Sequence, residues 1–266
     1  MENNRSYAVV TGGSGGIGYE LAKLLAKDHY NLVLVARNEQ ELAHAKQALE
    51  NEFGVDVQTI SKDLFEPRNA FEVYDEIANK RSLDVKILIN DAGQGHYGEF
   101  KDTDIEKELA IINLNIASLV ILTKKFLNDM LDAGEGRILN LSSIASKTPG
   151  PWQSVYHGTK AFVQSFTEAI RSENKDSGVT ITALLPGATD TDFFNKANMQ
   201  HSKIVVEGKL DDPEKVARDG YKALMSGADM VVSGIKNKVM VGMSNITPDA
   251  KVADKMKQQQ KPVTTK

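Results

Sequence analysis

The chain contains no cysteine among its 266 residues. This absence excludes disulfide bonds, thiol nucleophiles and thiolate metal sites, and it is typical of proteins from a reducing compartment. The five histidines are scattered and none of them forms a His-x-x-x-His pair. We therefore expect no metal site.

Strong charge of one sign and long apolar runs are also missing. The net charge of −4 gives no electrostatic reason to bind nucleic acid. The first five residues do not form an apolar signal segment, and we find no run of about 18 apolar residues that could span a membrane. We expect a soluble, cytoplasmic protein with neither nucleic acid nor a membrane as a partner.

What the sequence does contain is a regular alternation of strand and helix patterns. The expected strands are 7–10, 31–36, 55–60, 85–90, 136–141 and 180–185, and the expected helices are 19–27, 39–53, 67–80, 104–131, 154–172 and one that begins at Pro213 after an Asp211 or Asp212 cap. Such alternation predicts an α/β fold with a parallel sheet covered on both faces, and a ligand site outside the carboxyl ends of the strands.

Two segments depart from this alternation. Residues 188–212 have no strong strand pattern, and we interpret them as a lid over a substrate, with simple disorder as the alternative. Residues 255–266 are rich in lysine and glutamine, and we expect them to be a flexible, solvated terminus.

A glycine-rich turn, Thr11-Gly12-Gly13-Ser14-Gly15-Gly16-Ile17-Gly18, joins the first strand to the first helix. Glycine lets the backbone approach a pyrophosphate closely, and the helix that follows offers free N–H groups and the positive end of its dipole. Tight turns also use glycine for structural reasons alone. Its place between the first strand and the first helix favours a dinucleotide site.

Arg37 directly follows the second strand, where a site for NAD would place an acidic residue. An arginine can stack on adenine and pair with a 2′-phosphate. The alternative is an ordinary solvated arginine at a strand end. We predict NADP(H) as the cofactor.

Tyr156 and Lys160 lie one helical turn apart, and Ser143 precedes Tyr156 by thirteen residues. Side chains at i and i+4 share a helix face, so the Lys160 ammonium should lower the pKa of the Tyr156 phenol. A tyrosine with a lowered pKa can act as a general acid or base. A surface tyrosine and lysine on an amphipathic helix would show the same spacing.

Together these motifs resemble the short-chain dehydrogenase/reductase family over nearly the whole chain, and within it the bacterial NADP-preferring reductases. The matching elements are Thr11-Gly12-x-x-x-Gly16-x-Gly18, Asp63-Leu64, Asn90-Asp91-Ala92-Gly93, Asn115, Ser143, Tyr156-x-x-x-Lys160 and Pro186-Gly187-Ala188-Thr189-x-Thr191. The resemblance implies one Rossmann-type, doubly wound domain over residues 1–266, with a mostly parallel seven-stranded sheet. It also implies a homodimer or homotetramer.

The resemblance assigns four catalytic residues. Tyr156 would exchange a proton with a carbonyl or alcohol oxygen, and Ser143 would hydrogen-bond the same oxygen. Lys160 would lower the pKa of Tyr156 and bind the nicotinamide ribose. Asn115 would hold a water that relays protons to Lys160, although Asn113 is a competing candidate and a helix-interior asparagine can simply satisfy a buried group.

The resemblance also assigns cofactor residues. They are Gly12, Ser14, Gly16, Ile17, Gly18, Arg37, Asp63, Leu64, Asn90, Ala92, Gly93, Tyr156, Lys160, Pro186, Gly187, Thr189 and Thr191. Asp63 would accept a hydrogen bond from the adenine amino group, and Thr189 and Thr191 would meet the carboxamide and phosphates. Thr189 could equally be a turn residue.

Fewer features of the sequence support the residues that we expect to contact the substrate. We expect Ser143, His96, Trp152, Phe193 and Phe194 to contact the substrate, although aromatic residues in lids also serve packing. Two residues differ from the family pattern. Asp91 replaces an asparagine and should have a modest effect, and His157 should pack in the core or an interface because i+1 points away from Tyr156.

These predictions describe an oxidoreductase that transfers a hydride between NADP(H) and a carbonyl or secondary alcohol substrate. The alternative is a catalytically idle, NADP(H)-sensing regulatory protein on the same fold. A sugar-nucleotide epimerase or dehydratase shares the Tyr-x-x-x-Lys pattern, but only about 80 residues follow Pro186, too few for the substrate domain that such enzymes need.

Overall fold

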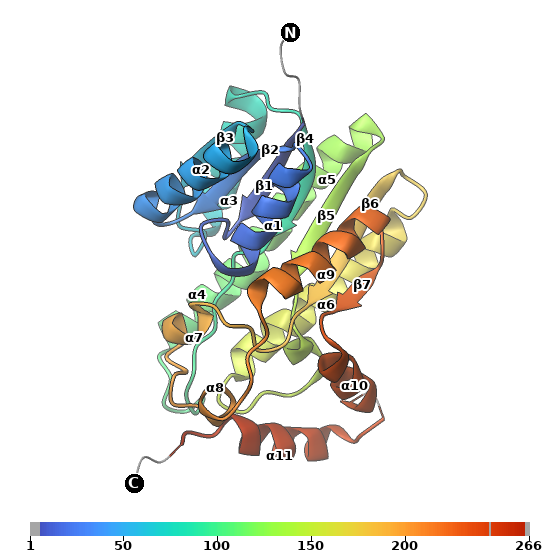
Figure 1. Cartoon of the computed structure of the whole chain (residues 1–266). Helices are drawn as coiled ribbons and strands as arrows, with labels where there is room; N and C mark the ends of the chain where they lie inside the picture. The colour runs from blue at the N-terminus through green and yellow to red at the C-terminus, as the bar shows by residue number, and fades with distance from the viewer. Residues whose placement is uncertain (1–5, 245, 264–266) are drawn as a thin grey trace.

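The computed structural model describes residues 6–244 and 246–263, and its strands form one sheet (Figure 1). The sheet order is β3-β2-β1-β4-β5-β6-β7, and every pair is parallel. The strands are β1 (Tyr7–Thr11), β2 (Asn31–Ala36), β3 (Val57–Ser61), β4 (Val85–Asn90), β5 (Gly136–Leu141), β6 (Val179–Leu185) and β7 (Met230–Val232). This order confirms the predicted single-domain, doubly wound fold.

The strand order reverses between β1 and β4, because the chain crosses back over β1 after β3. Thr11 at the end of β1 pairs with Asn90 at the end of β4. In open parallel sheets the crevice at such a reversal is where ligands bind. The glycine-rich turn and the Asn90-Asp91-Ala92-Gly93 segment leave the sheet on the two sides of this point.

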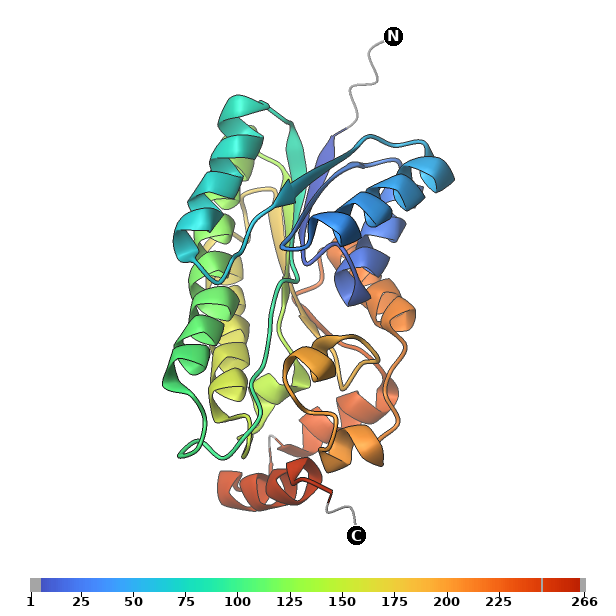
Figure 2. The same ribbon diagram turned by 90° about the vertical axis from the view of Figure 1, so that its left-hand side faces the viewer.

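Helices cover both faces of the sheet, which gives three layers in the view of Figure 2. One face carries α1 (Gly16–Lys27), α2 (Glu39–Phe53) and α9 (Pro213–Ser226); the other carries α3 (Pro67–Tyr74), α4 (Ile105–Ile112), α5 (Leu119–Ala133) and α6 (Ser154–Glu173). Two π-helical segments, η1 (Asp75–Lys80) and η2 (Asn113–Ser118), and a 3₁₀ turn, η3 (Ile144–Lys147), interrupt or precede these helices. Short helices α7 (Phe193–Lys196) and α8 (Lys203–Val206) lie within the predicted lid.

Local sequence explains where the helices begin and end. The Asn38 side chain accepts hydrogen bonds from the backbone of Gln40 and Glu41 and starts α2, while Gly54, with φ of 63°, ends it. Asp212 caps α9 and Pro213 occupies its first turn. This confirms the second of the two caps that the sequence allowed.

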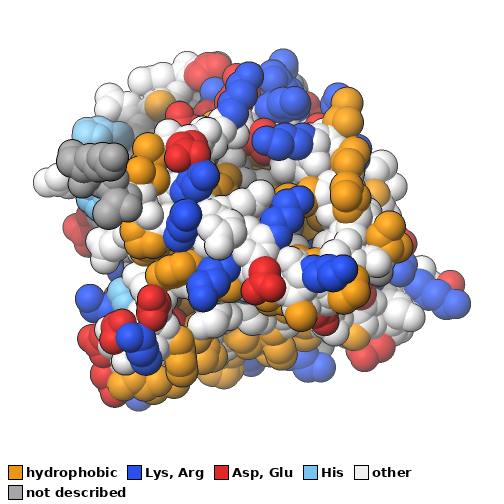
Figure 3. Space-filling view, turned by 90° about the horizontal axis from the view of Figure 1, so that it is seen from below, with side chains coloured by type: hydrophobic (Ala, Val, Ile, Leu, Met, Phe, Trp, Pro, Cys, Tyr) orange, Lys and Arg blue, Asp and Glu red, His pale blue; other side chains and the backbone are white. Residues whose placement is uncertain are grey.

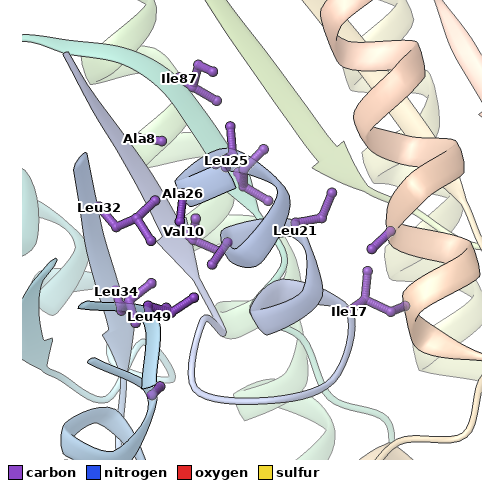
Figure 4. Packing of buried hydrophobic residues seen from close by; sticks show 14 of the residues in the cluster. Ala8, Val10, Ile17, Leu21, Leu25, Ala26, Leu32, Leu34, Leu49 and Ile87 are labelled. Atoms are coloured by element: carbon purple, nitrogen blue, oxygen red, sulfur yellow. The ribbon is translucent and has the colours of Figure 1, made fainter. Parts of the chain in front are cut away.

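The central strands are buried on both faces, which is why their sequences are apolar without alternation. Ala8 and Val10 of β1 pack with Leu21 and Leu25 of α1 (Figure 4). Val9, between them, points to the opposite face and joins the cluster under α3 and α5. Burying one leucine or valine side chain stabilises the fold by about 1.5–3 kcal/mol.

The continuous helical segment from Ile105 to Ala133 is long and apolar enough, by length and composition, to cross a membrane. It is the one exception, among the described residues, to the expectation that no segment could do so. Its α5 part packs against the sheet through Leu122, Phe126 and Met130, which are buried with residues of β4 and β5. The apolar face of α5 is therefore used by the core, whereas Ile105, Leu109 and Ile112 of α4 are exposed.

The C-terminal segment differs from the prediction. Residues 255–260 were expected to be a flexible terminus but belong to α11 (Asp249–Gln260), which follows α10 (Ile235–Ser244) and lies under the carboxyl ends of the strands (Figure 1). Val252, Met256 and Gln260 recur every four residues and are buried. The backbone of Lys203 donates to Lys261, and that of Val263 donates to His201. Residues 264–266 lie outside the described part of the chain.

The outer face of α11 is charged. Figure 3 views this end of the molecule from below and shows lysine and arginine side chains spread among apolar ones. Lys251, Lys255 and Lys257 are exposed on α11. The helix therefore presents a charged face to solvent and an apolar face to the lid.

Candidate active site

A cavity of about 1160 Å³ opens at the carboxyl ends of the strands. It extends from the glycine-rich turn and Arg37 to Tyr156, the lid and α11. The predicted site residues that line it are Gly12, Ser14, Gly16, Ile17, Arg37, Asp63, Leu64, Ala92, Gly93, Ser143, Tyr156, Lys160, Pro186, Gly187, Thr189, Thr191, Phe193 and Phe194. Gly18, Asn90, Asn115, His96 and Trp152 were predicted as site residues but are not among the lining residues.

The glycine-rich turn has the geometry of an anion cradle. Gly12 and Gly16 have φ of 71° and 56°, where a side chain would strain the backbone. Helix α1 begins at this turn, and no side chain of the described residues caps it. Its first N–H groups and the positive end of its dipole therefore face the cavity, which fits the binding of a pyrophosphate.

Asp91 fastens this turn to β4. Its carboxyl group accepts a hydrogen bond from the Gly18 backbone N–H. A Cβ atom on Gly18 would lie 2.6 Å from Asp91 Oδ2, and one on Gly12 would lie 2.7 Å from it. Both glycines therefore make room for the carboxyl group of Asp91, the residue that differs from the family pattern.

Burial penalises the charge on Asp91 and raises its pKa to about 7, an effect that the nearby Lys160 ammonium partly opposes. Thr11 completes the junction, because its Oγ1 accepts hydrogen bonds from the backbones of Asp91 and Ala92, each at 3.1 Å.

Arg37 lines the cavity and directly follows the last residue of β2. Its guanidinium carbon stands 4.9 Å from the centroid of the Phe65 ring. It forms no ion pair with any acid in residues 6–244 and 246–263, so its charge is available to a ligand. Ala36 occupies the end of β2, where an NAD site would carry an acid.

Tyr156 and Lys160 lie on the cavity side of α6, as their spacing predicted. Lys160 Nζ stands 5.9 Å from the centroid of the Tyr156 ring and donates a 2.7 Å hydrogen bond to the backbone oxygen of Leu141. Tyr156 is half-buried and Lys160 is buried. The two groups are thus held beside each other in a largely dry site.

The pKa of Tyr156 does not follow the predicted direction. Burial raises it to about 12, and a hydrogen bond with Ser143 opposes this rise. Burial also lowers the pKa of Lys160 to about 8, while Asp91 opposes that change. In the protein alone, the loss of hydration therefore outweighs the attraction between the lysine and a phenolate.

Ser143 is fixed at the start of η3. Its Oγ accepts a 3.1 Å hydrogen bond from the backbone of Ala145 and lies 3.4 Å from the backbone oxygen of Pro186. It also forms a hydrogen bond with Tyr156. Ser143 and Tyr156 can therefore address one oxygen atom of a ligand together.

Asn115 lies in η2 rather than in the cavity wall. Its side chain exchanges two hydrogen bonds with the backbone of Gln94, at 2.9 and 3.0 Å, and donates a third to Thr159 Oγ1 at 3.0 Å. A Cβ atom on Gly93 would lie 3.3 Å from both Asn115 Oδ1 and Lys160 Nζ. Asn115 thus ties the loop after β4 to α6 beside Lys160.

The predicted lid brings apolar side chains to the part of the cavity that contains Tyr156. The rings of Tyr156 and Phe193 have centroids 5.2 Å apart. Phe194, Ala197 and Met199 form a buried cluster within the lid, against which Tyr97 packs. His96 and Trp152 lie outside the cavity lining; the Trp152 backbone oxygen instead accepts a hydrogen bond from Gly98.

The family model for short chain dehydrogenases matches residues 6–202, which include the glycine-rich turn and the Ser143, Tyr156 and Lys160 cluster. This chain belongs to the short-chain dehydrogenase family.

Curated relatives include very-long-chain 3-oxoacyl-CoA reductases. The protein from Rattus norvegicus is 34% identical over 188 residues, which are 68% of this chain and 58% of that protein. The chain therefore spans little more than half the length of such relatives. An uncharacterized oxidoreductase from Bacillus subtilis is 28% identical over 232 residues, 85% of this chain and 94% of that protein.

Solved structures share the fold over nearly the whole chain. A short-chain dehydrogenase from Sphingobium yanoikuyae in complex with NADPH superposes with a TM-score of 0.81 at 26% identity, over 94% of this chain and 99% of that one. L-sorbose reductase from Gluconobacter frateurii, complexed with NADPH and L-sorbose, superposes with a TM-score of 0.74 at 25% identity, over 87% of this chain and 96% of that one.

Several residues of this short-chain dehydrogenase site were not predicted. Gln94 and Thr159 hold Asn115, while Gln153, Met256 and Gln260 line the cavity. Gln153 precedes Tyr156 by three residues, so helical spacing could have indicated it. Met256 and Gln260 come from α11, whose polar sequence gave no sign of its position.

Proposed function

We propose that this short-chain dehydrogenase transfers a hydride between NADP(H) and a ketone or secondary alcohol, with Tyr156 as general acid and base. The observation that carries the proposal is the continuity of the cavity. One end holds the glycine-rich turn and Arg37, and the other holds Ser143, Tyr156 and Lys160.

The residues around the cavity fit a dinucleotide phosphate. The N–H groups of the glycine-rich turn and α1 would bind the pyrophosphate, and Arg37 would pair with a 2′-phosphate while it stacks beside adenine. Asp63 would accept from the adenine amino group. Thr189 and Thr191 line the cavity at the start of the lid and would meet the carboxamide and phosphates, while Tyr156 and Lys160 would hold the nicotinamide ribose.

The chemistry then divides between cofactor and protein. When bound, NADPH supplies the hydride that reaches the carbonyl carbon. The Ser143 hydroxyl donates a hydrogen bond to the carbonyl oxygen and stabilises the charge that develops there. The Tyr156 phenol gives its proton to that oxygen, and Lys160 stabilises the resulting phenolate; oxidation of an alcohol reverses these steps. Asn115, through Gln94 and Thr159, keeps the surroundings of Lys160 in place.

A 3-oxoacyl thioester is the substrate class that we favour. Relatives that act on such compounds cover two thirds of this chain. The apolar side chains at the catalytic end, Phe193, Phe194, Met199 and Met240, suit an acyl chain. The cytoplasmic location of the protein remains a prediction, and so does its assembly as a homodimer or homotetramer.

Single-turnover reduction of an acetoacetyl thioester by NADPH tests this proposal, with Tyr156→Phe as the matched variant. We expect the wild type to consume NADPH in step with thioester and the variant to lose about 10²–10⁴-fold in rate while it still binds NADPH. Tight NADPH binding with no turnover of any carbonyl compound would instead support the idle, NADP(H)-sensing alternative.

A further inference from the structure

Two buried glutamines at the catalytic end of the cavity carry polar atoms without partners. Gln153 and Gln260 are 5% and 2% exposed, and both line the cavity. Gln153 Nε2 and Gln260 Oε1 have no hydrogen-bond partner among the described residues. A buried donor without a partner is unfavourable, so its position calls for a ligand atom.

His157 fixes the orientation of both amides. Its Nδ1 lies 2.7 Å from the backbone oxygen of Thr148, which can only accept, so Nδ1 carries the proton. Burial lowers the pKa of His157, and the backbone oxygens of Thr148 and Ala145 oppose this change. At a pH above the ordinary value of about 6.5 the ring is therefore neutral. Nε2 is therefore an acceptor, and Gln260 Nε2, at 3.1 Å, must donate to it.

The second N–H of the Gln260 amide reaches Gln153 Oε1 at 3.5 Å. Because Gln153 Oε1 faces Gln260, the amide nitrogen Nε2 of Gln153 points away from Gln260. A Cβ atom on Gly95 would lie 3.1 Å from Gln153 Nε2, 3.5 Å from Tyr156 Cδ2 and 2.9 Å from Phe193 Cζ. The unpartnered donor therefore lies beside the catalytic tyrosine and the lid.

Further contacts hold α11 where Gln260 can reach both His157 and Gln153. The Tyr97 hydroxyl donates to the backbone oxygen of Gln260, and Gly150 leaves room for the His157 ring, since a Cβ there would lie 2.0 Å from His157 Cδ2. Tyr97, His157 and Gln260 come from three distant parts of the chain, and together they orient the amide of Gln153.

We propose that Gln153 is a specificity residue whose Nε2 donates a hydrogen bond to a second oxygen of the substrate, the thioester carbonyl of a 3-oxoacyl group, while Gln260 and His157 position it. The inference rests on the proposed function. The reacting ketone oxygen is taken by Ser143 and Tyr156. A carbonyl two carbons away is an acceptor close enough to meet a donor on the adjacent side of the Tyr156 ring.

Two probes isolate this contact. One is the N-acetylcysteamine thioester of acetoacetate; the other is the matched thioether ketone, in which CH₂ replaces the thioester carbonyl. The ratio of their kcat/KM values with NADPH is compared in wild type, Gln153→Met, Gln260→Met and Gln164→Met. Gln164 is a buried glutamine of α6 that lies outside the cavity lining, and it serves as the control.

We expect Gln153→Met to lower the thioester-to-ketone ratio of kcat/KM about tenfold, because only the thioester loses a hydrogen bond in this variant. Gln260→Met should lower the ratio less, and Gln164→Met should leave it as in the wild type. An unchanged ratio in Gln153→Met, or an equal loss on both probes, would overturn the inference.

Binding of both probes to the NADPH-loaded Tyr156→Phe protein separates this inference from the proposed function. If wild type reduces neither probe but the loaded variant binds the thioester more tightly than the thioether through Gln153, the recognition holds and the proposed reaction fails. If the loaded variant binds both probes equally, with or without Gln153, the recognition fails whatever the turnover.

Discussion

The Asp91 carboxyl group accepts a hydrogen bond from the backbone N–H of Gly18 and lies in the electrostatic field of Lys160. One side chain thus connects the glycine-rich turn to Lys160. An asparagine at this position, as in the family pattern, could keep the hydrogen bond but not the charge.

Asp91→Asn should remove a pH-dependent loss of stability. The pKa of Asp91 is about 7 in the folded protein and about 4 in an unfolded chain. Between these values the native state keeps a proton that the unfolded state has released, so wild-type stability falls as the pH rises through this window. We expect the free energy of unfolding of the variant to exceed that of the wild type by an amount that grows to roughly 1–4 kcal/mol as the pH rises from 4 to 7.

Urea unfolding at several pH values measures this difference, and Asp102→Asn, a change of an exposed acid, is the control. A stability difference between wild type and Asp91→Asn that does not vary with pH would contradict the account.

Alcohol oxidation and ketone reduction should respond to pH in opposite ways. Burial holds the pKa of Tyr156 near 12, so the phenol is protonated and ready to act as an acid at neutral pH. Oxidation needs the phenolate, and its kcat/KM should rise with pH from 6 to 9. Reduction should stay level and then decline above about 8, where Lys160 loses its charge. Steady-state rates in both directions check this; an oxidation rate that falls as the pH rises would contradict it.

Gly150→Ala and Gly158→Ala should change stability in opposite directions. The added methyl group at Gly150 would overlap the His157 ring, and we expect a loss of about 1–3 kcal/mol. Gly158 is exposed within α6 and nothing lies within 4 Å of a Cβ there, so alanine should stabilise the helix by about 0.5–1 kcal/mol. Denaturant titrations of the two variants measure this, and equal effects would show that the His157 contact is not tight.

The sequence predicted the parts of this molecule that depend on local pattern. The apolar strands, the glycine-rich turn and the i, i+4 spacing of Tyr156 and Lys160 each follow from neighbours in the chain, and the structure places them as expected. The cap of α9 and the glycine that ends α2 are local in the same way.

The parts that could not be predicted depend on distant contacts. The raised pKa of Tyr156 could not be predicted from residue spacing, because it depends on burial. The contact of Asp91 with Gly12 and Gly18 also could not, because it depends on how β4 packs against the glycine-rich turn. Helix α11 has a polar sequence, and only its contacts with His157, Tyr97 and the lid show that Gln260 belongs to the site.

Titration of the protein with NADPH and NADH, followed by nicotinamide fluorescence, tests whether the cavity binds NADP(H) through Arg37, with Arg37→Ala as the matched variant. We expect tight NADPH binding that the variant loses by about ten- to a hundredfold, while weak NADH binding is the same in both proteins. A preference for NADH in the wild type would contradict the role of Arg37, and binding of neither nucleotide by folded protein would contradict the proposed oxidoreductase altogether.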